Sequence, residues 1–211
     1  MNVLDSIKNE VKKRMENDSA HDYEHTMRVY KNAQKICKKE KANETLVLSA
    51  ALLHDIVSYQ KSDKHSKLSS IESAKKSKKI LEKFDFSKEE ITIISDAIRD
   101  HSFSQNKIPI TSEGKILQDA DRLDALGAIG IARVFATGGS LKRPFYNIDD
   151  PFCKKRTPDD NTWTVDHFYQ KLLKLESLMN TKSGKIEAKK RTRILKEFLN
   201  QLKQEILEKR E

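Results

Sequence analysis

Several histidines and acids of this chain have side chains that could together hold a divalent metal ion: His21, His25, His54, Asp55, Asp121 and Asp124. Imidazole nitrogens and carboxylate oxygens are ligands that a borderline or hard divalent cation accepts. Taken singly, each residue has an ordinary explanation as a core histidine or as a paired structural acid. Because the set comes from three separate predicted helices, we predict that it forms one site.

His54 and Asp55 lie at the end of an apolar segment, residues 46–53. His54 lies on the buried face of this predicted helix, since it is in helical register with Val47, Ala50 and Ala51. Asp55, the acid beside it, must be desolvated or paired, and a buried carboxylate without a partner costs several kcal/mol. We therefore expect a cation close to Asp55.

Asp121 repeats this pattern in the predicted helix that contains residues 116–126. Asp124 lies one turn further along the same face, whereas Asp119 points elsewhere. Earlier in the chain, His21 and His25 are four residues apart at the start of another predicted helix. His21 with the following acid also fits an N-terminal cap, so the pattern leaves its role open.

The order of these residues resembles the H…HD…D signature of the HD-domain metal-dependent phosphohydrolases. Asp121 matches the family's Ala-Asp-x-Leu position within Ala120-Asp121-Arg122-Leu123. The signature covers about residues 20–135. The segments 147–152 and 166–168 and the C-terminal helix are similar to the small nucleotide-hydrolysing HD proteins of bacteria and archaea. The resemblance implies one divalent ion, held by His25, His54, Asp55 and Asp121, with manganese expected and Mg, Fe, Co, Ni or Zn as alternatives.

Three departures from the wider family narrow the expected activity. Where some relatives carry histidines for a second metal, this chain has Ser69 and Ser70. The acidic pair that follows His-Asp in guanosine tetraphosphate hydrolases is Ser58-Tyr59 here, and the glycine-rich signature of the cyclic-dinucleotide phosphodiesterases is absent. A single metal and a small nucleotide substrate are the resulting expectation.

Further side chains are expected to act beside the metal, because cations stabilise the charge of a reacting phosphoryl group. The candidate catalytic residues are Asp55, Lys61, His101 and Asp124. His101 could protonate a leaving oxygen or bind phosphate, and Asp124 could orient water, contact a ribose hydroxyl or serve structurally. The candidate substrate-binding residues are His21, Arg28, Arg133 and Arg143, and the weaker candidates among the cations are Arg99, Arg122 and Lys142.

Helices are predicted nearly throughout, so the fold expected is all-α: an HD-domain helical bundle with a long flap loop and C-terminal helices. One domain over residues 1–211 is expected, with the metal-site core at about 20–135, the flap at 138–163 and C-terminal helices at 164–209. The predicted helices cover residues 3–15, 22–38, 43–57, 69–84, 87–100, 112–126, 128–137, 164–179 and 188–209. The flap contains three prolines, but its aromatic residues indicate an ordered segment.

Composition excludes several other classes of protein. The chain has 211 residues, 36% of them hydrophobic, and its six Gly and four Pro are too few for an all-β protein built on tight turns. The apolar stretches 46–53 and 125–132 fall short of the ~20 residues of a membrane span. With two cysteines and no apolar leader after Met1, a cytoplasmic location without membrane partners is expected, as a monomer or homodimer.

The net charge of +9 attracts phosphate without identifying its source. The basic clusters are dispersed along the chain and alternate with Glu, which favours solvated helix faces. We therefore predict hydrolysis of a small nucleotide, either a nucleoside or deoxynucleoside triphosphate to monophosphate and diphosphate, or a monophosphate to nucleoside and phosphate. The alternatives are a nucleic-acid phosphodiesterase or RNA-binding HD protein, and a nucleotide sensor without turnover.

Overall fold

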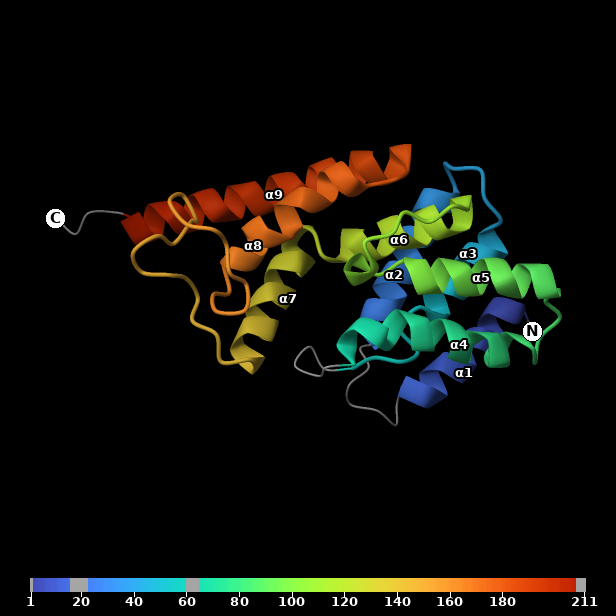
Figure 1. Cartoon of the computed structure of the whole chain (residues 1–211). Helices are drawn as coiled ribbons and strands as arrows, with labels where there is room; N and C mark the ends of the chain where they lie inside the picture. Colours follow the sequence, from blue (N-terminus) through green and yellow to red (C-terminus); the bar gives the residue numbers. More distant parts are fainter. Residues whose placement is uncertain (1, 16–22, 60–64, 208–211) are drawn as a thin grey trace. The chain divides into compact units, whose positions relative to one another are not determined.

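The computed structural model describes residues 2–15, 23–59 and 65–207, and every regular element in these ranges is a helix (Figure 1). This confirms the all-α prediction. The contacts group the chain into two compact units. Unit 1 comprises Met1–Asp121 with Asn180–Gly184, and unit 2 comprises Arg122–Met179 with Lys185–Glu211. The expectation of one domain over the whole chain stays a prediction.

Unit 1 is built around α3, Glu44–Leu53, in which every residue from Leu46 to Leu53 is buried. Asn43 caps this helix, because its side chain accepts hydrogen bonds from the backbone N–H groups of Thr45 and Leu46. The helix ends at Leu53, four residues earlier than predicted, so that His54 and Asp55 lie in a turn. The helices packed against α3 are α1 (Val3–Met15), α2 (Tyr23–Cys37), α4 (Ser69–Leu81) and α5 (Lys88–Asp100).

The α4–α5 hairpin confirms a predicted helix start. Ser87 accepts a hydrogen bond from the backbone N–H of Glu90, and the Glu90 carboxylate accepts one from the backbone N–H of Ser87. This capping box fixes where α5 begins. The short 3-10 helix η1 (Ser66–Leu68) leads into α4, η2 (Phe103–Gln105) follows α5, and α6 (Ser112–Asp124) completes the helices of this half of the chain.

Unit 2 differs from the predicted helices at three places. The helix expected over residues 164–179 is divided at Lys171, and the last helix begins at Lys182 and not at Ala188. Gly138 was expected to end a helix but lies inside one, at a position where a Cβ atom would come within 2.4 Å of Thr164 Oγ1. Its hydrogen side chain therefore permits close packing. The helices are α7 (Gly127–Ser140), α8 (Asp166–Gln170), η3 (Leu172–Leu178) and α9 (Lys182–Leu207), whose first residues, up to Gly184, belong to unit 1.

The long segment between α7 and α8 is tied to unit 2 by a buried acid. Asp166 is fully buried and accepts hydrogen bonds from the Arg156 guanidinium and from the backbone N–H of Asp159. At the other end of the segment, the Phe145 ring packs edge-on against Phe135 of α7. These contacts hold the predicted flap in an ordered conformation.

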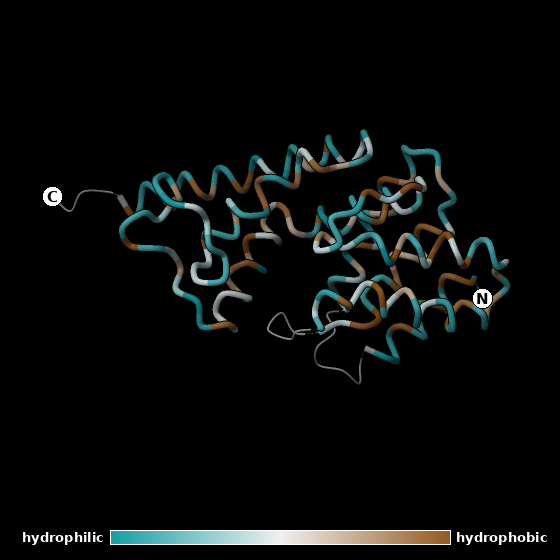
Figure 2. The backbone as a smooth tube through the Cα atoms, viewed as in Figure 1, coloured by the Kyte–Doolittle hydropathy of each residue, from teal (hydrophilic) through white to brown (hydrophobic). Residues whose placement is uncertain are grey.

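Hydrophobic residues recur along the helices at intervals, interrupted by hydrophilic ones, as in amphipathic helices (Figure 2). Across the part of the chain that the structure describes, no helix combines the length and apolar character needed to cross a membrane.

Candidate metal centre

Three helical segments bring imidazole and carboxylate groups together in unit 1. His25 comes from α2, His54 follows α3, and Asp121 comes from α6. The Nε2 atoms of the two histidines are 3.3 Å apart, and His25 Nε2 lies 3.4 Å from Asp121 Oδ1. One ligand atom from each of these residues lies within 4.8 Å of the others. This spacing allows the three side chains to bind the same ion.

Asp55 completes the group from the turn after α3. Its Oδ2 atom is 3.6 Å from His25 Nε2 and 3.5 Å from His54 Nε2. Its side chain is 32% exposed and that of Asp121 is 27% exposed, whereas His54 is fully buried. The carboxylates therefore face the solvent side of the cluster, where a substrate could approach.

His101, at the end of α5, adds a third imidazole to the cluster. Its Nε2 atom lies 3.8 Å from Asp55 Oδ1, and its ring packs edge-on against His54 with the centroids 5.1 Å apart. His54, Asp55 and His101 form a second set of ligand atoms within 4.8 Å of one another. His101 is 4% exposed, so it faces the cluster from within the unit.

Backbone carbonyl groups orient two of these imidazole rings. His54 Nδ1 lies 2.8 Å from the carbonyl oxygen of Ala51, and His101 Nδ1 lies 2.6 Å from that of Ile98. A ring nitrogen that faces a carbonyl oxygen must carry the proton. The Nε2 lone pairs of both rings therefore face the cluster, in the tautomer that a metal ion requires.

The turn that carries His54 and Asp55 is held by α4. Ser73 Oγ donates a hydrogen bond to the carbonyl oxygen of Val57 and accepts one from the same residue's N–H, each 3.0 Å long. Ser73 is fully buried, which protects both bonds from water. The place of this turn is thus fixed by the helix that follows it in sequence.

A buried glutamine holds α6 beside the end of α5. Gln118 donates hydrogen bonds to the carbonyl oxygens of Asp100 and Lys107 and accepts one from the Asn180 side chain. Asp100 directly precedes His101, so the same contact links the segments that carry His101 and Asp121. A further contact links α6 to α2, because Asn32 of α2 donates a 3.2 Å hydrogen bond to the carbonyl oxygen of Ala120.

Asp119 is a buried anchor that the sequence reasoning missed. Its carboxylate accepts hydrogen bonds from the backbone N–H and side-chain amide of Asn180, and from the backbone N–H and hydroxyl of Thr181. A Cβ atom on Gly184 would lie 2.4 Å from Asp119 Oδ2, so only glycine leaves room for this contact. The Asn-Thr pair just before a helix was the available sequence signal.

The acids of the cluster are set up to remain ionised. Burial raises the pKa of Asp121, but a hydrogen bond from His25 and the nearby histidines outweigh it and hold that pKa below its usual range. For Asp55, burial acts in the same upward direction, and interaction with His54 and His25 again lowers the pKa overall. Burial lowers the pKa of His54, which favours its neutral form. Neutral imidazole and ionised carboxylate are the states that bind metals.

Other predicted site residues are placed differently. Asp124 is buried and forms an ion pair with Arg133 within unit 2, where Arg143 also lies, at the start of the flap. Arg28 follows His25 by one turn on α2 and is partly exposed. The structure therefore gathers the four predicted metal ligands with His101 but pairs Asp124 with Arg133. Lys61 and His21 lie outside the described residues.

The donor set fits one divalent ion. The predicted ligands offer two imidazole nitrogens and two carboxylates, which suits Mn, Fe, Co, Ni or Zn. At the start of α4, Ser69 and Ser70 provide no imidazole or carboxylate, and a single ion stays a prediction. Ser70 Oγ is buried and has no hydrogen-bond partner among the described residues.

Comparison with known proteins gives matches along nearly the whole chain. A family model described as the HD domain matches residues 22–126. The protein YpgQ of Bacillus subtilis strain 168 is 35% identical over 192 residues, which span 89% of this chain and 85% of YpgQ.

Two solved structures extend the match to the fold. An HD-superfamily hydrolase from Bacillus thuringiensis has a TM-score of 0.75 and 37% identity, with 96% of this chain and 95% of that chain covered. The crystal structure of B. subtilis YpgQ in complex with ADP has a TM-score of 0.74 and 32% identity, with 97% and 95% covered. The matched regions thus include both compact units.

Proposed function

Because the chain belongs to the HD-domain family, we propose that it is a metal-dependent phosphohydrolase acting on small nucleotides. The observation that carries the proposal is the cluster of His25, His54, Asp55 and Asp121, whose ligand atoms converge from three separate helices. The ADP complex of YpgQ supports a nucleotide as the ligand class. The reaction proposed is attack of water on a phosphorus atom of the nucleotide.

In this proposal, His25, His54, Asp55 and Asp121 hold one divalent ion, with manganese expected. Such an ion, when bound, supplies positive charge for a phosphate oxygen and lowers the pKa of water. The two imidazole rings bind as neutral ligands, and the two carboxylates reduce the net charge of the site. The partial exposure of both acids leaves a side of the cluster open to substrate.

His101 is the proposed acid or phosphate-binding residue beside the ligands. Its Nδ1–H is engaged by the Ile98 carbonyl, so only Nε2 can hold or release a proton toward the reacting group. The 3.8 Å separation of Nε2 from Asp55 Oδ1 supports this role, because Asp55 is a proposed metal ligand and the substrate is proposed to bind at the metal. When Nε2 also carries a proton, His101 can stabilise negative charge on a departing oxygen.

The preferred substrate in this proposal is a nucleoside or deoxynucleoside triphosphate, cleaved to monophosphate and diphosphate. Arg28 and the cations predicted in the flap and after the His-Asp turn, Arg143 and Lys61, favour the more highly charged substrate. Hydrolysis of a monophosphate to nucleoside and phosphate is the alternative for the same site. In either case Asp124 is paired with Arg133 within unit 2, so a structural role is proposed for it.

Product analysis would test the proposal directly. Metal-stripped protein is incubated with nucleoside mono- and triphosphates, while Mn(II), Mg(II), Co(II) and Ni(II) are added one at a time. Metal-dependent release of diphosphate supports the triphosphate reaction, and release of inorganic phosphate from a monophosphate supports the alternative. No turnover with any metal would leave the sensor hypothesis in its place.

Two matched pairs of variants assign the activity to the cluster. Asp55→Ala and His54→Ala should abolish turnover. Asp96→Ala and His65→Ala remove the same side chains from more exposed positions and should retain it. Activity that survives in Asp55→Ala would show that the product comes from another site or from a contaminant.

A further inference from the structure

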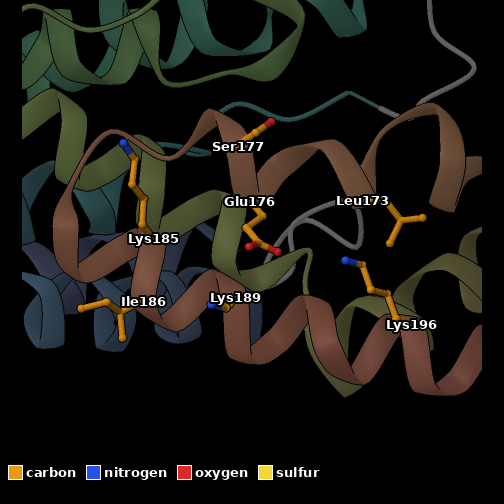
Figure 3. Close-up of a pocket in the computed structure, with 7 residues that line it drawn as sticks. All are labelled: Leu173, Glu176, Ser177, Lys185, Ile186, Lys189 and Lys196. Atoms are coloured by element: carbon orange, nitrogen blue, oxygen red, sulfur yellow. The ribbon is translucent and has the colours of Figure 1, made fainter.

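Unit 2 contains a basic groove between η3 and α9 that no part of the proposed reaction uses. It has a volume of about 600 Å³. Figure 3 shows Leu173, Glu176 and Ser177 of η3 with the four residues that α9 contributes. A second, adjoining hollow shares four of these residues and adds two more cations. The α9 residues of this basic groove are Lys185, Ile186, Lys189, Lys190, Arg193 and Lys196.

Helical periodicity explains why these cations form one surface. Residues Ala188, Thr192, Leu195 and Leu199 of α9 are buried, so the side chains on the opposite side are exposed. Lys185, Lys189, Arg193 and Lys196 recur at intervals of three or four residues along the helix, and Lys190 adjoins Lys189. Lys185 and Lys196 are eleven residues apart, or about 16 Å along the helix axis. The helix thus aligns these cations, which are close together in the sequence, along one surface.

The positive charge of the groove is largely uncompensated. Among the described residues, none of the four lysines forms an ion pair, and Arg193 has only an exposed contact with Glu197 at 3.4 Å. Glu176 is the one acid among the lining residues of both hollows. Because few acids balance this positive charge, the groove attracts a polyanion.

The chemistry of the lining distinguishes between possible polyanions. A second copy docked by the same face would place lysines against lysines, so an isologous dimer is disfavoured. Only Leu173 and Ile186 are apolar, which leaves little hydrophobic surface for a folded protein partner. A row of lysines along a helix matches the regularly spaced charges of a phosphodiester backbone. A single strand is flexible enough for its backbone to follow this row of lysines along α9.

We propose that the basic groove of η3 and α9 binds the phosphodiester backbone of single-stranded nucleic acid. The groove has no aromatic lining residue, so base stacking does not contribute. Recognition is therefore electrostatic and independent of base sequence. The binding is separate from the proposed hydrolysis, because every lining residue lies in unit 2 and every proposed metal ligand lies in unit 1.

The test is the fluorescence anisotropy of a labelled oligouridylate, titrated with the full-length protein in the presence of EDTA to prevent cleavage. The groove variant carries Lys185→Gln, Lys189→Gln, Lys190→Gln and Lys196→Gln. The control carries Lys75→Gln, Lys78→Gln, Lys79→Gln and Lys88→Gln, which remove the same charge from exposed positions of unit 1. Far-UV circular dichroism verifies that both variants are folded.

The groove variant should bind roughly tenfold or more weakly than the control at low salt. The slope of log affinity against log salt should be less steep in the groove variant, by up to about 0.7 for each phosphate that the groove no longer neutralises.

Equal losses in the two variants, or no binding by the unaltered protein, would overturn the proposal. It would also fail if polyglutamate of equal charge, or a duplex of equal length, bound as tightly as the oligouridylate. Self-association that only the groove variant loses, without nucleic-acid binding, would point to a second copy and also overturn it.

Discussion

The Nε2 atoms of His25 and His54 lie 3.3 Å apart although the residues belong to segments 29 positions apart in sequence. The His54 ring is fixed with its proton on Nδ1, so its Nε2 atom offers a lone pair to His25. Without a cation, a proton on His25 must satisfy this lone pair and the adjacent carboxylates. A divalent ion between the same atoms can replace that proton, so the geometry of the cluster favours binding of a metal.

Removal of one ligand should therefore release the metal without unfolding the chain. We expect His54→Ala and Asp55→Ala to weaken metal affinity by more than roughly 100-fold, which exceeds the usual loss for an outer-shell partner. The loss follows because the remaining ligands cannot fill the coordination shell. Metal content after dialysis, measured by mass spectrometry beside far-UV circular dichroism, checks this. Unchanged metal content in both variants would show that the ion binds elsewhere.

Asp119→Asn should destabilise the protein although Asp119 belongs to no proposed metal site. An amide keeps one acceptor oxygen and turns an N–H donor toward the donors of Asn180 and Thr181. We expect a loss of about 2–3 kcal/mol in the free energy of unfolding in urea. Asp96→Asn, which breaks an exposed ion pair with Arg99, should cost less than about 1 kcal/mol. Equal losses in the two variants would contradict the anchoring role.

The contrast between Asp121 and Asp119 shows how far sequence reasoning reached. Helical periodicity placed Asp121 on the inner face of its helix, and the signature joined it to the three other ligands. The partners of Asp119 are more than 60 residues away, and no local pattern predicts such a pairing. Gly138 illustrates the same limit, since the side chain that leaves no room for a Cβ atom there, Thr164, comes from a segment distant in sequence. Contacts between segments that are distant in sequence therefore determine features of the fold that local sequence patterns do not predict.

Asp124 and Arg133 should behave as a coupled structural pair. Arg133 donates to Asp124, whose side chain is 2% exposed, while that of Arg133 is 44% exposed. Arg133→Gln leaves the buried acid without this cation and should be destabilising, whereas Asp124→Asn in the same chain should recover part of the loss. We expect a coupling energy of about 1–2 kcal/mol, reduced by the exposure of Arg133. Urea denaturation of both single variants and the double variant measures it, and additive effects would contradict the pairing.

The two cysteines should react slowly with thiol reagents in the folded protein. Burial, together with the charges of Glu44 and Glu113, raises the pKa of Cys37 to about 12. Burial and a hydrogen bond with Asp166 raise the pKa of Cys153 to about 11. Because the thiolate is the reactive form, labelling at pH 8 should be at least about tenfold slower than for a free thiol at Cys153, and slower still at Cys37. The rate at each site should rise with pH until it approaches that site's pKa.

Kinetics with Ellman's reagent in the Cys37→Ser and Cys153→Ser variants separate the two thiols. The same variants unfolded in urea serve as the reference and should react at the rate of a free thiol. Rapid labelling of the folded protein at pH 8 would contradict the raised pKa values. A faster reaction at Cys37 than at Cys153 would contradict their order.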